Sequence, residues 1–401
     1  MAPESDALLE DGDPLEGVEN TSLGDTLGRN WPAVVFTIGS CALAAGFHYE
    51  HVRGTPVPGL GDLEPVDWLL AVALLAGGAM LMSVARRPDS ARIYLRRLRN
   101  RPTAMVSALV VGVFLLVGLV GPAFVSEPTE IRFSRAYLPP VWTTVDTQHL
   151  IGPCLGEVTD GACHGTWAHP FGTDRAGQDL FAFVVLGTRT AVEIALVTTL
   201  VMVPVGVGVG LLSGVVGGRV DAALMRLAEV LGTLPAVIVY ILFWSWNAKY
   251  RLLVLILAFG LVNWGGLARA VRNETLDLRE QGFVQAARAA GASRWHVARY
   301  HLLPNVGRPV LSTLALQVPL LVAVEAALSF VQLPVTQGVA TLGDPSVVSW
   351  GQVIYRGVRV DGLVPAWWIT VVPTLVLIVT MLSLATFSRS LSDVFAPVEE
   401  R

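Results

Sequence analysis

QAARAAGASRWHVARYHLLP, residues 285–304, is a polar, arginine-containing stretch that lies between two long apolar segments. Its alanine-rich first half favours a short helix, because alanine has the highest intrinsic helix propensity. Gly291 can adopt the left-handed conformation that ends such a helix without a Cβ clash. Ser293 can accept a hydrogen bond from the free amides at the start of a second helix. The stretch therefore predicts an elbow of two helices on a membrane surface, with small side chains that let another protein approach closely.

The chain on either side of this elbow is strongly apolar. Of its 401 residues 53% are hydrophobic and 15% are charged, with a mean hydropathy of +0.58, whereas soluble proteins carry about 25% charged residues. A helix needs about 20 apolar residues to cross a bilayer, and the apolar runs are continuous rather than alternating. We expect eight spans, at 31–47, 66–85, 103–125, 190–213, 225–246, 251–270, 310–332 and 364–387. The predicted fold is an all-α polytopic membrane protein.

The connecting segments differ in their arginine content. The link at 86–102 and the region 269–308 are both rich in arginine, whereas the loops on the other side of the predicted membrane carry few. Basic loops stay on the cytoplasmic side, and both basic segments fall on one side if all eight runs cross. We therefore expect a protein of the cell membrane with both termini and the elbow in the cytoplasm.

The elbow closely resembles the EAA loop of permease subunits of binding-protein-dependent ABC importers. The family pattern is Glu-Ala-Ala, then a glycine, then a Leu-Pro pair, and Ala286, Ala287, Gly291 and residues 303–304 match it. Gln285 replaces the glutamate, so the position keeps its hydrogen-bonding capacity but loses its charge. The residues that lead into the elbow read like the dipeptide and oligopeptide branch of the family. The alternative is an ordinary cytoplasmic loop of two amphipathic helices.

Further segments match the family in the right order over roughly 103–396. HPFGTDRAGQDLF at 169–181 resembles the approach to the second core span, and SGVVGGRVDAALMRL at 213–227 resembles a conserved cytoplasmic turn and the start of the next span. Pro235 is expected to kink or break the helix that follows. FSRSLSDVFAP at 387–397 resembles the usual cytoplasmic ending. The resemblance implies a core of six transmembrane helices.

The chain divides into four regions on these grounds. Residues 1–30 form an acidic tail that is predicted to be a disordered cytoplasmic segment. Residues 31–102 form an additional two-helix hairpin followed by the basic link, and scaffolding is a more natural role for it than transport. Residues 103–186 hold the first core span and a long extracellular loop, and residues 187–396 hold the permease core with the coupling loop at 280–305.

Two cysteines lie in the long external loop, in the segment GPCLGEVTDGACHG. An extracytoplasmic location permits a disulfide between Cys154 and Cys163. His149, His164 and His169 lie nearby, so a metal site is the alternative, although the spacing matches no familiar zinc pattern. We favour the disulfide over free thiols or a metal site.

Acidic residues also occur inside the predicted spans. Glu325 lies within the span 310–332, where an ionisable side chain is costly and therefore a functional candidate. Family members usually carry an acid here, so the resemblance favours a place on the translocation path or at a helix interface. A structural, hydrogen-bonded carboxylate is the competing interpretation. Arg189 and Glu193 lie one helical turn apart and can pair with each other, so neither needs a transport role.

The sequence holds no chemistry that could supply energy or catalysis. It contains no GxxxxGK[ST] phosphate loop, no GxSxG and no HExxH motif, so no catalytic, cofactor or metal site is expected in this chain. A membrane-embedded enzyme would need clustered nucleophiles or metal ligands, and an ion-coupled secondary transporter would need paired buried charges or inverted repeats. ATP and Mg²⁺ would be bound by separate subunits.

The resemblance implies a permease that encloses half of a translocation path for di- or oligopeptides. Nickel chelates or another small solute remain the alternative cargo. The implied partners are a second homologous permease, two ATP-binding subunits, an extracellular solute-binding protein and membrane lipid, and nothing indicates nucleic acid. The residues expected to dock on an ATPase are Phe283, Gln285, Ala286, Ala287, Gly291, Ala292 and Ser293.

Overall fold

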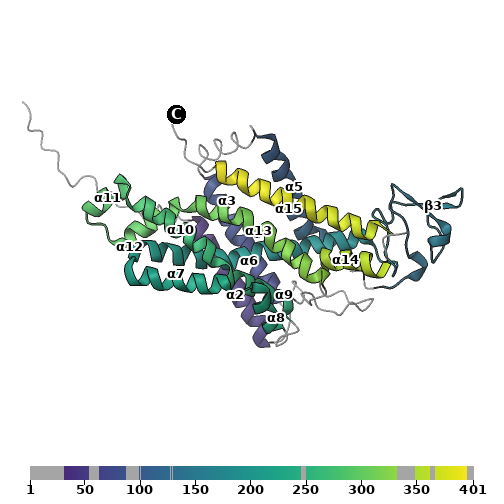
Figure 1. Ribbon diagram of the computed structural model, residues 1–401, viewed down its shortest axis with the longest axis horizontal. Helices are drawn as coiled ribbons and strands as arrows, with labels where there is room; N and C mark the ends of the chain where they lie inside the picture. Colours follow the sequence, from purple (N-terminus) through teal and green to yellow (C-terminus); the bar gives the residue numbers. More distant parts are fainter. Residues whose placement is uncertain are drawn as a thin grey trace, which may run out of the picture.

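The computed structural model describes residues 31–53, 63–86, 99, 101–126, 128, 130–244, 250–331, 348–361 and 366–394. The predicted acidic tail, most of the basic link and the loop that precedes Ser349 lie outside these residues. The described residues form a helical bundle with a small β-sheet at one end (Figure 1).

The long apolar segments of the sequence form the helices of the bundle. Among the residues that the structure describes, seven helices are long and apolar enough to cross a membrane, or eight if one bent pair counts as a single span. The predicted all-α polytopic fold is therefore confirmed. The helices are α2 (Trp31–Arg53), α3 (Pro65–Ala85), α5 (Pro102–Val120), α6 (Leu180–Val216), α7 (Gly218–Thr233), α8 (Ala236–Trp244), α9 (Arg251–Val262), α10 (Trp264–Arg279), α11 (Gly282–Ala289), α12 (Arg294–Val297), α13 (Gly307–Phe330), α14 (Trp350–Arg356) and α15 (Trp368–Val394).

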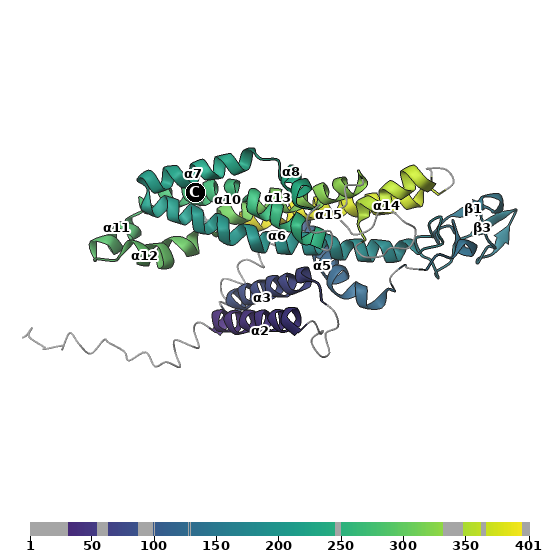
Figure 2. The ribbon, with the colours of Figure 1, turned by 90° about the horizontal axis from the view of Figure 1, so that it is seen from below.

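The bundle is elongated, and its two ends differ. Helices α11 and α12 lie at one end, which we call the elbow end, and the strands lie at the other, which we call the sheet end (Figure 1). Helix α6 runs between them along the middle of the bundle (Figure 2). Its 37 residues span roughly 55 Å at about 1.5 Å per residue, well beyond the hydrocarbon thickness of about 30 Å. Helix α6 is therefore too long to fit upright within the hydrocarbon layer.

Glycines allow α6 to pack closely on α10. A Cβ atom on Gly206, Gly210 or Gly214 would lie less than 3.0 Å from Leu267, from Ala268 and Val271, or from Thr275, respectively. Because these glycines are four residues apart, they form a stripe on one face of α6. Small residues at this spacing let two backbones approach closely where no hydrophobic force draws helices together in lipid.

Three spans differ from those predicted, and the one predicted at 251–270 extends to Arg279 as the two helices α9 and α10. Helix α6 begins at Leu180 rather than near 190, because the Asp179 side chain accepts a hydrogen bond from the Phe181 amide at 2.9 Å and caps the helix. The single span predicted at 225–246 is two helices, α7 and α8, which are bent by 74°. Leu234 is extended at the break, as expected for a residue before proline, and Pro235 cannot donate to the helix ladder.

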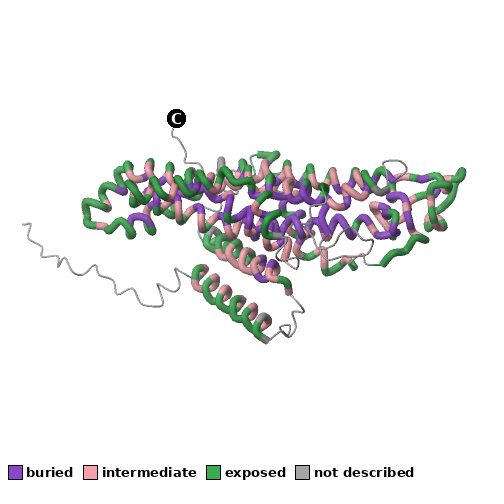
Figure 3. The backbone as a smooth tube through the Cα atoms, turned by 60° about the horizontal axis from the view of Figure 1, so that its bottom comes forward, coloured by how far each residue is buried: buried purple, intermediate pink, exposed green. Residues whose placement is uncertain are grey.

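The hairpin of α2 and α3 lies beside the core rather than within it (Figure 2). The two helices meet closely where glycines allow it, since a Cβ atom on Gly39 or Gly46 would strike Leu75 or Trp68. In Figure 3 the hairpin is mostly exposed or half-buried, whereas the middle of the bundle is buried. Helix α3 is the member of the pair that lies against α6 and α9.

Candidate functional site

The elbow has the local structure that its sequence predicts. Helix α11 ends in a Schellman motif, in which the Gly291 amide donates to the Arg288 carbonyl at 3.0 Å and the Ala292 amide donates to the Ala287 carbonyl at 3.0 Å. Gly291 has a φ of +88°, a conformation that costs a residue with a side chain free energy. Ser293 then caps α12 by accepting a hydrogen bond from the His296 amide at 3.2 Å.

One side of the elbow is attached to the bundle. Val284, Val297 and Leu302 are buried and belong to one apolar cluster with Val271 and Leu278 of α10. The elbow continues from α12 through a π-helical turn at Ala298–Leu302 and a 3₁₀ turn at Leu303–Asn305 into α13. These turns join α12 directly to α13.

The other side of the elbow exposes large apolar side chains. Trp295 is 74% exposed and Tyr300 is 60% exposed, and Phe283 and Leu303 are exposed as well. A concentration of exposed aromatic residues on a polar segment marks an interaction surface. The residues that the sequence predicts to dock do not include Trp295 or Tyr300. Two aromatic residues among arginines in RWHVARYH were a signal that could have added them.

The residues expected to dock are brought together on the outer part of the elbow. Phe283, Gln285, Ala286, Gly291 and Ser293 are exposed, and the alanines at 287 and 292 are half-buried. The Gln285 side chain donates to the Glu280 carbonyl at 2.9 Å. The residue that replaces the family's glutamate therefore anchors α11 to the preceding turn through a neutral hydrogen bond.

Hydrogen-bonded charged residues, which we call the clasp, join three helices that precede the elbow. Arg272 of α10 binds Asp221 of α7 through two hydrogen bonds of 2.5 Å, and Ser213 of α6 donates to the same carboxylate. Arg279, the last residue of α10, donates to the Gly214 carbonyl of α6. A bidentate arginine–carboxylate pair fixes geometry as well as distance. The clasp ties α6 and α7 to α10, which leads into α11.

Glu325 lies inside the bundle, where it joins α13 to α14. Its side chain is buried, it accepts a hydrogen bond from Ser329 at 2.9 Å, and it is hydrogen-bonded to Ser349. Ser349 also caps α14 by accepting from the Gly351 amide. A Cβ atom on Gly351 would lie 1.9 Å from the Ala326 carbonyl oxygen, so only glycine permits this approach of α14 to α13.

Helix α14 is also attached to α6. The Trp350 indole donates to the Val184 carbonyl at 3.1 Å, and its ring fills the space that a side chain on Gly187 would need. Thr190 donates to the Val348 carbonyl at 2.8 Å. The Ser-Trp-Gly segment at 349–351 is therefore the point where α6, α13 and α14 meet.

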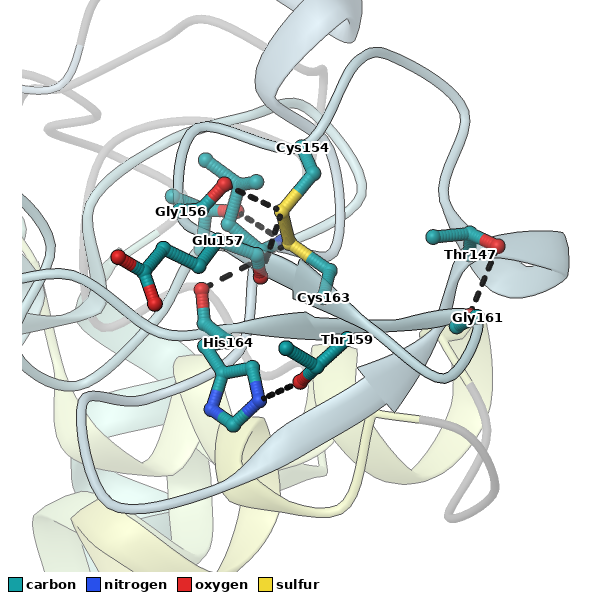
Figure 4. Close-up of a disulfide and its surroundings, with 10 residues drawn as sticks. Thr147, Cys154, Gly156, Glu157, Thr159, Gly161, Cys163 and His164 are labelled. Atoms are coloured by element: carbon teal, nitrogen blue, oxygen red, sulfur yellow. Dashed lines mark hydrogen bonds between the residues drawn. A yellow bond between two sulfur atoms is a disulfide. The ribbon is translucent and has the colours of Figure 1, made fainter.

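The sheet end carries the cysteine pair. Strands β1 (Thr144–Asp146), β2 (Val158–Thr159) and β3 (Ala162–His164) form an antiparallel sheet in the order β1-β3-β2. Cys163 lies on β3 and is joined to Cys154 by a disulfide, with the two Cα atoms 5.7 Å apart (Figure 4).

The three histidines near the cysteines lie at separate places. His164 bonds the Thr159 hydroxyl at 2.6 Å (Figure 4), His169 lies 3.2 Å from the Asp179 carboxylate, and His149 ends a short 3₁₀ turn. Among the residues described, no group of three or more histidines, cysteines or acids is arranged to hold a metal ion.

Replacing both Cys154 and Cys163 with serine is expected to destabilise the sheet end. The disulfide closes a loop with a sequence separation of 9 residues, which corresponds to about 3 kcal/mol of loop-closure entropy in the unfolded chain. Limited proteolysis of the purified chain in mild detergent should cut the 140–170 region faster in the variant than in the parent chain. Equal cleavage rates would show that the sheet is stable without the bond.

These features define a class of protein. The fold is a polytopic helical membrane protein, with a disulfide-bonded subdomain at one end of the bundle and an elbow that exposes aromatic side chains at the other.

The comparisons with known proteins give the family. A family model described as the inner membrane component of binding-protein-dependent transport systems matches residues 206–398, and a model of the N-terminal transmembrane domain of oligopeptide transport permease C matches residues 91–140. The chain belongs to this family of inner membrane components, as a relative that is 33% identical and covered over 72% of its length also shows, and the family consists of permease subunits of ABC importers rather than ATPases. Helices α2 and α3 lie outside both matches.

Several curated relatives resemble the chain. It is 33% identical over 229 residues to the oligopeptide transport system permease protein OppC of Escherichia coli K12, covering 57% of this chain and 72% of that one. It is 27% identical over 301 residues to the probable D,D-dipeptide transport system permease protein DdpC of the same organism, covering 75% and 89%. The chain is also 33% identical over 227 residues to the dipeptide transport system permease protein DppC of Lactococcus lactis. This match covers 57% of this chain and 63% of that protein.

Proposed function

We propose that this chain is a transmembrane permease subunit of an ATP-driven importer, and that the elbow couples it to an ATP-binding subunit. The observation that carries the proposal is the exposed aromatic side of the elbow, formed by Phe283, Trp295 and Tyr300, on a segment whose other side is buried in the bundle. The elbow end is the cytoplasmic end in this proposal, which agrees with its arginine content and places the disulfide outside the cytoplasm.

The proposed mechanism depends on the link between α12 and α13 and on the contacts between helices within this chain. Closure of two ATP-binding subunits moves the elbow, and the direct link from α12 into α13 carries the motion into the membrane. The Asp221–Arg272 clasp holds α6, α7 and α10 together during this step, so the bundle moves as one body. A second homologous permease completes the translocation path, and an extracellular solute-binding protein delivers solute at the sheet end.

Peptides are the solute class that the relatives favour. The relatives described above are named as dipeptide, D,D-dipeptide and oligopeptide permeases. We therefore assign di- or oligopeptides to this importer. The chain itself docks on an ATP-binding subunit and forms half of the translocation path. The energy for transport comes from the ATP-binding subunits.

Purification of the tagged chain from its native membranes tests the proposal. We expect two P-loop ATPase chains and a second permease to co-purify, and a Trp295→Ala, Tyr300→Ala variant to lose the ATPases while keeping the permease. Trp142→Ala is the matched control, because Trp142 is an exposed aromatic residue at the sheet end. Reproducible isolation of the chain alone in active form would refute the proposed coupling to ATP-binding subunits.

The solute class is tested separately. The solute-binding protein that co-purifies or is encoded beside the chain is loaded with a mixture of dipeptides, oligopeptides and nickel chelates, and bound ligands are identified by mass spectrometry. Peptide in the binding site would support the assignment. Retention of a nickel chelate or another solute would replace it without affecting the coupling proposal.

A further inference from the structure

The α2–α3 hairpin contacts the core over a small area. The buried side chains described for α3 lie in its first two turns, at Val66, Trp68 and Leu70, whereas Leu81 and Met82 further along are exposed. No described residue of α2 is fully buried. Figure 3 shows the same pattern, with burial in the hairpin confined to one end.

A charged triad lies at this contact. Arg189 of α6 forms an ion pair with Asp67 of α3 and a second one with Glu193, whose carboxylate oxygen lies 2.7 Å from the Arg189 Nε atom. Glu193 is buried, and the Arg189 and Asp67 side chains are 38% and 19% exposed. The second oxygen of Asp67 accepts from the Glu64 amide at 2.9 Å, so the same carboxylate also supports the first turn of α3.

Apolar packing alone does not explain why the hairpin binds the core at this position. Lipid tails are as apolar as leucine, so helices in a bilayer gain specificity from close packing and from polar contacts. Most of the hairpin surface is not closely packed on the core: a Cβ atom on Gly77 or Gly78 would meet nothing within 4 Å. Among the described residues, the triad is a polar contact beside Val66 and Leu70, the hairpin side chains that are buried in the core cluster.

We propose that the α2–α3 hairpin is an accessory unit that binds the permease core non-covalently, and that Arg189 and Glu193 on α6 form its binding site by receiving Asp67. Without the hairpin, Arg189 would keep Glu193 as a partner and lose the carboxylate of Asp67. The hairpin supplies the missing carboxylate. This inference is independent of which solute the importer carries.

A cleavable form of the full chain tests the proposal. A protease site is inserted between residues 87 and 98, the chain is purified in mild detergent, cut, and captured by a tag on its C-terminus. We expect the unsubstituted hairpin to stay bound. In Asp67→Asn, which keeps the side-chain shape and the Glu64 hydrogen bond, the ratio of bound to free hairpin should fall at least roughly tenfold, because one partner of a partly buried charge pair is lost.

Further variants identify the contact. Arg189→Gln should release the hairpin as Asp67→Asn does, and the double variant should add little, because both changes remove the same interaction. The matched control is Glu50→Gln, which also removes a hairpin carboxylate, but one that accepts only from Leu63 and Trp68 within the hairpin among the bonds described. This variant should retain the hairpin.

Two results would overturn the proposal. Equal retention in all variants would show that apolar packing holds the hairpin, and loss of the unsubstituted hairpin after cutting would show that only the covalent link does. If the single variants prove unstable before cutting, the cut parent chain is washed at rising salt concentration, because salt weakens an ion pair but does not weaken apolar packing. Release of the hairpin at high salt supports the triad, and retention that salt does not change contradicts it.

Discussion

Gly291→Pro is expected to abolish the coupling of ATP hydrolysis to transport while the chain still inserts into the membrane. Gly291 has a φ of +88°, and proline is restricted to about −65°. Proline would also remove the amide that donates to the Arg288 carbonyl. Both changes break the Schellman motif that sets the angle between α11 and α12, so the docking side chains would no longer share one surface.

Gly291→Ala should give a smaller effect of the same kind. A Cβ atom at this position would meet nothing within 4 Å, so the cost is backbone strain of about 1–2 kcal/mol rather than a clash. Gly282→Ala is the matched control: Gly282 begins the same helix and also has free space around it, and its backbone lies outside the left-handed region. We expect the control to behave like the parent chain.

The measurement is solute-stimulated ATP hydrolysis by the complete importer in proteoliposomes. The proline variant should retain basal hydrolysis by the ATPase subunits and lose stimulation, whereas the Gly282 control should keep both. Normal stimulation in Gly291→Pro would show that the elbow angle does not carry the signal, and the docking proposal would fall.

Features set by local sequence were predictable. The turn at Gly291 and the cap at Ser293 depend on residues within one helical turn, and both occur as expected. The helical membrane fold follows from continuous apolar runs, because a bilayer leaves few alternatives to a helix. The sequence also predicted a kink or break at Pro235. The angle of 74° was not predictable, because it depends on what α7 and α8 pack against.

Features that depend on distant partners were not predictable. The sequence showed that Arg189 and Glu193 can pair, but Asp67 lies 122 residues away from Arg189, and no periodicity relates them. The role of Gly187 appears only when the Trp350 ring is placed against it. In the same way, Glu325 was recognisable as an acid within a span, but not as the residue that joins α13 to Ser349 before α14.

Glu325→Gln is expected to keep both stability and transport, and Glu325→Ala is expected to lose both. The glutamine carbonyl can accept hydrogen bonds from Ser329 and Ser349 as the carboxylate does, so the change should cost no more than about 0.6 kcal/mol. Alanine would leave both hydroxyls without this partner and create a cavity, at a combined cost of about 2 kcal/mol or more. Because α14 depends on Ser349 for its cap, its attachment to α13 should loosen.

Thermal unfolding of the purified permease and solute uptake by the reconstituted importer distinguish the two roles of this acid. In the structural role, uptake follows stability across the variants, and Ser329→Ala should fall between the glutamine and alanine variants. A Glu325→Gln variant of normal stability that fails to transport would instead place the negative charge on the translocation path. The amide can still accept these hydrogen bonds but cannot carry a negative charge, so this one substitution distinguishes a structural role in joining helices from a role in solute binding.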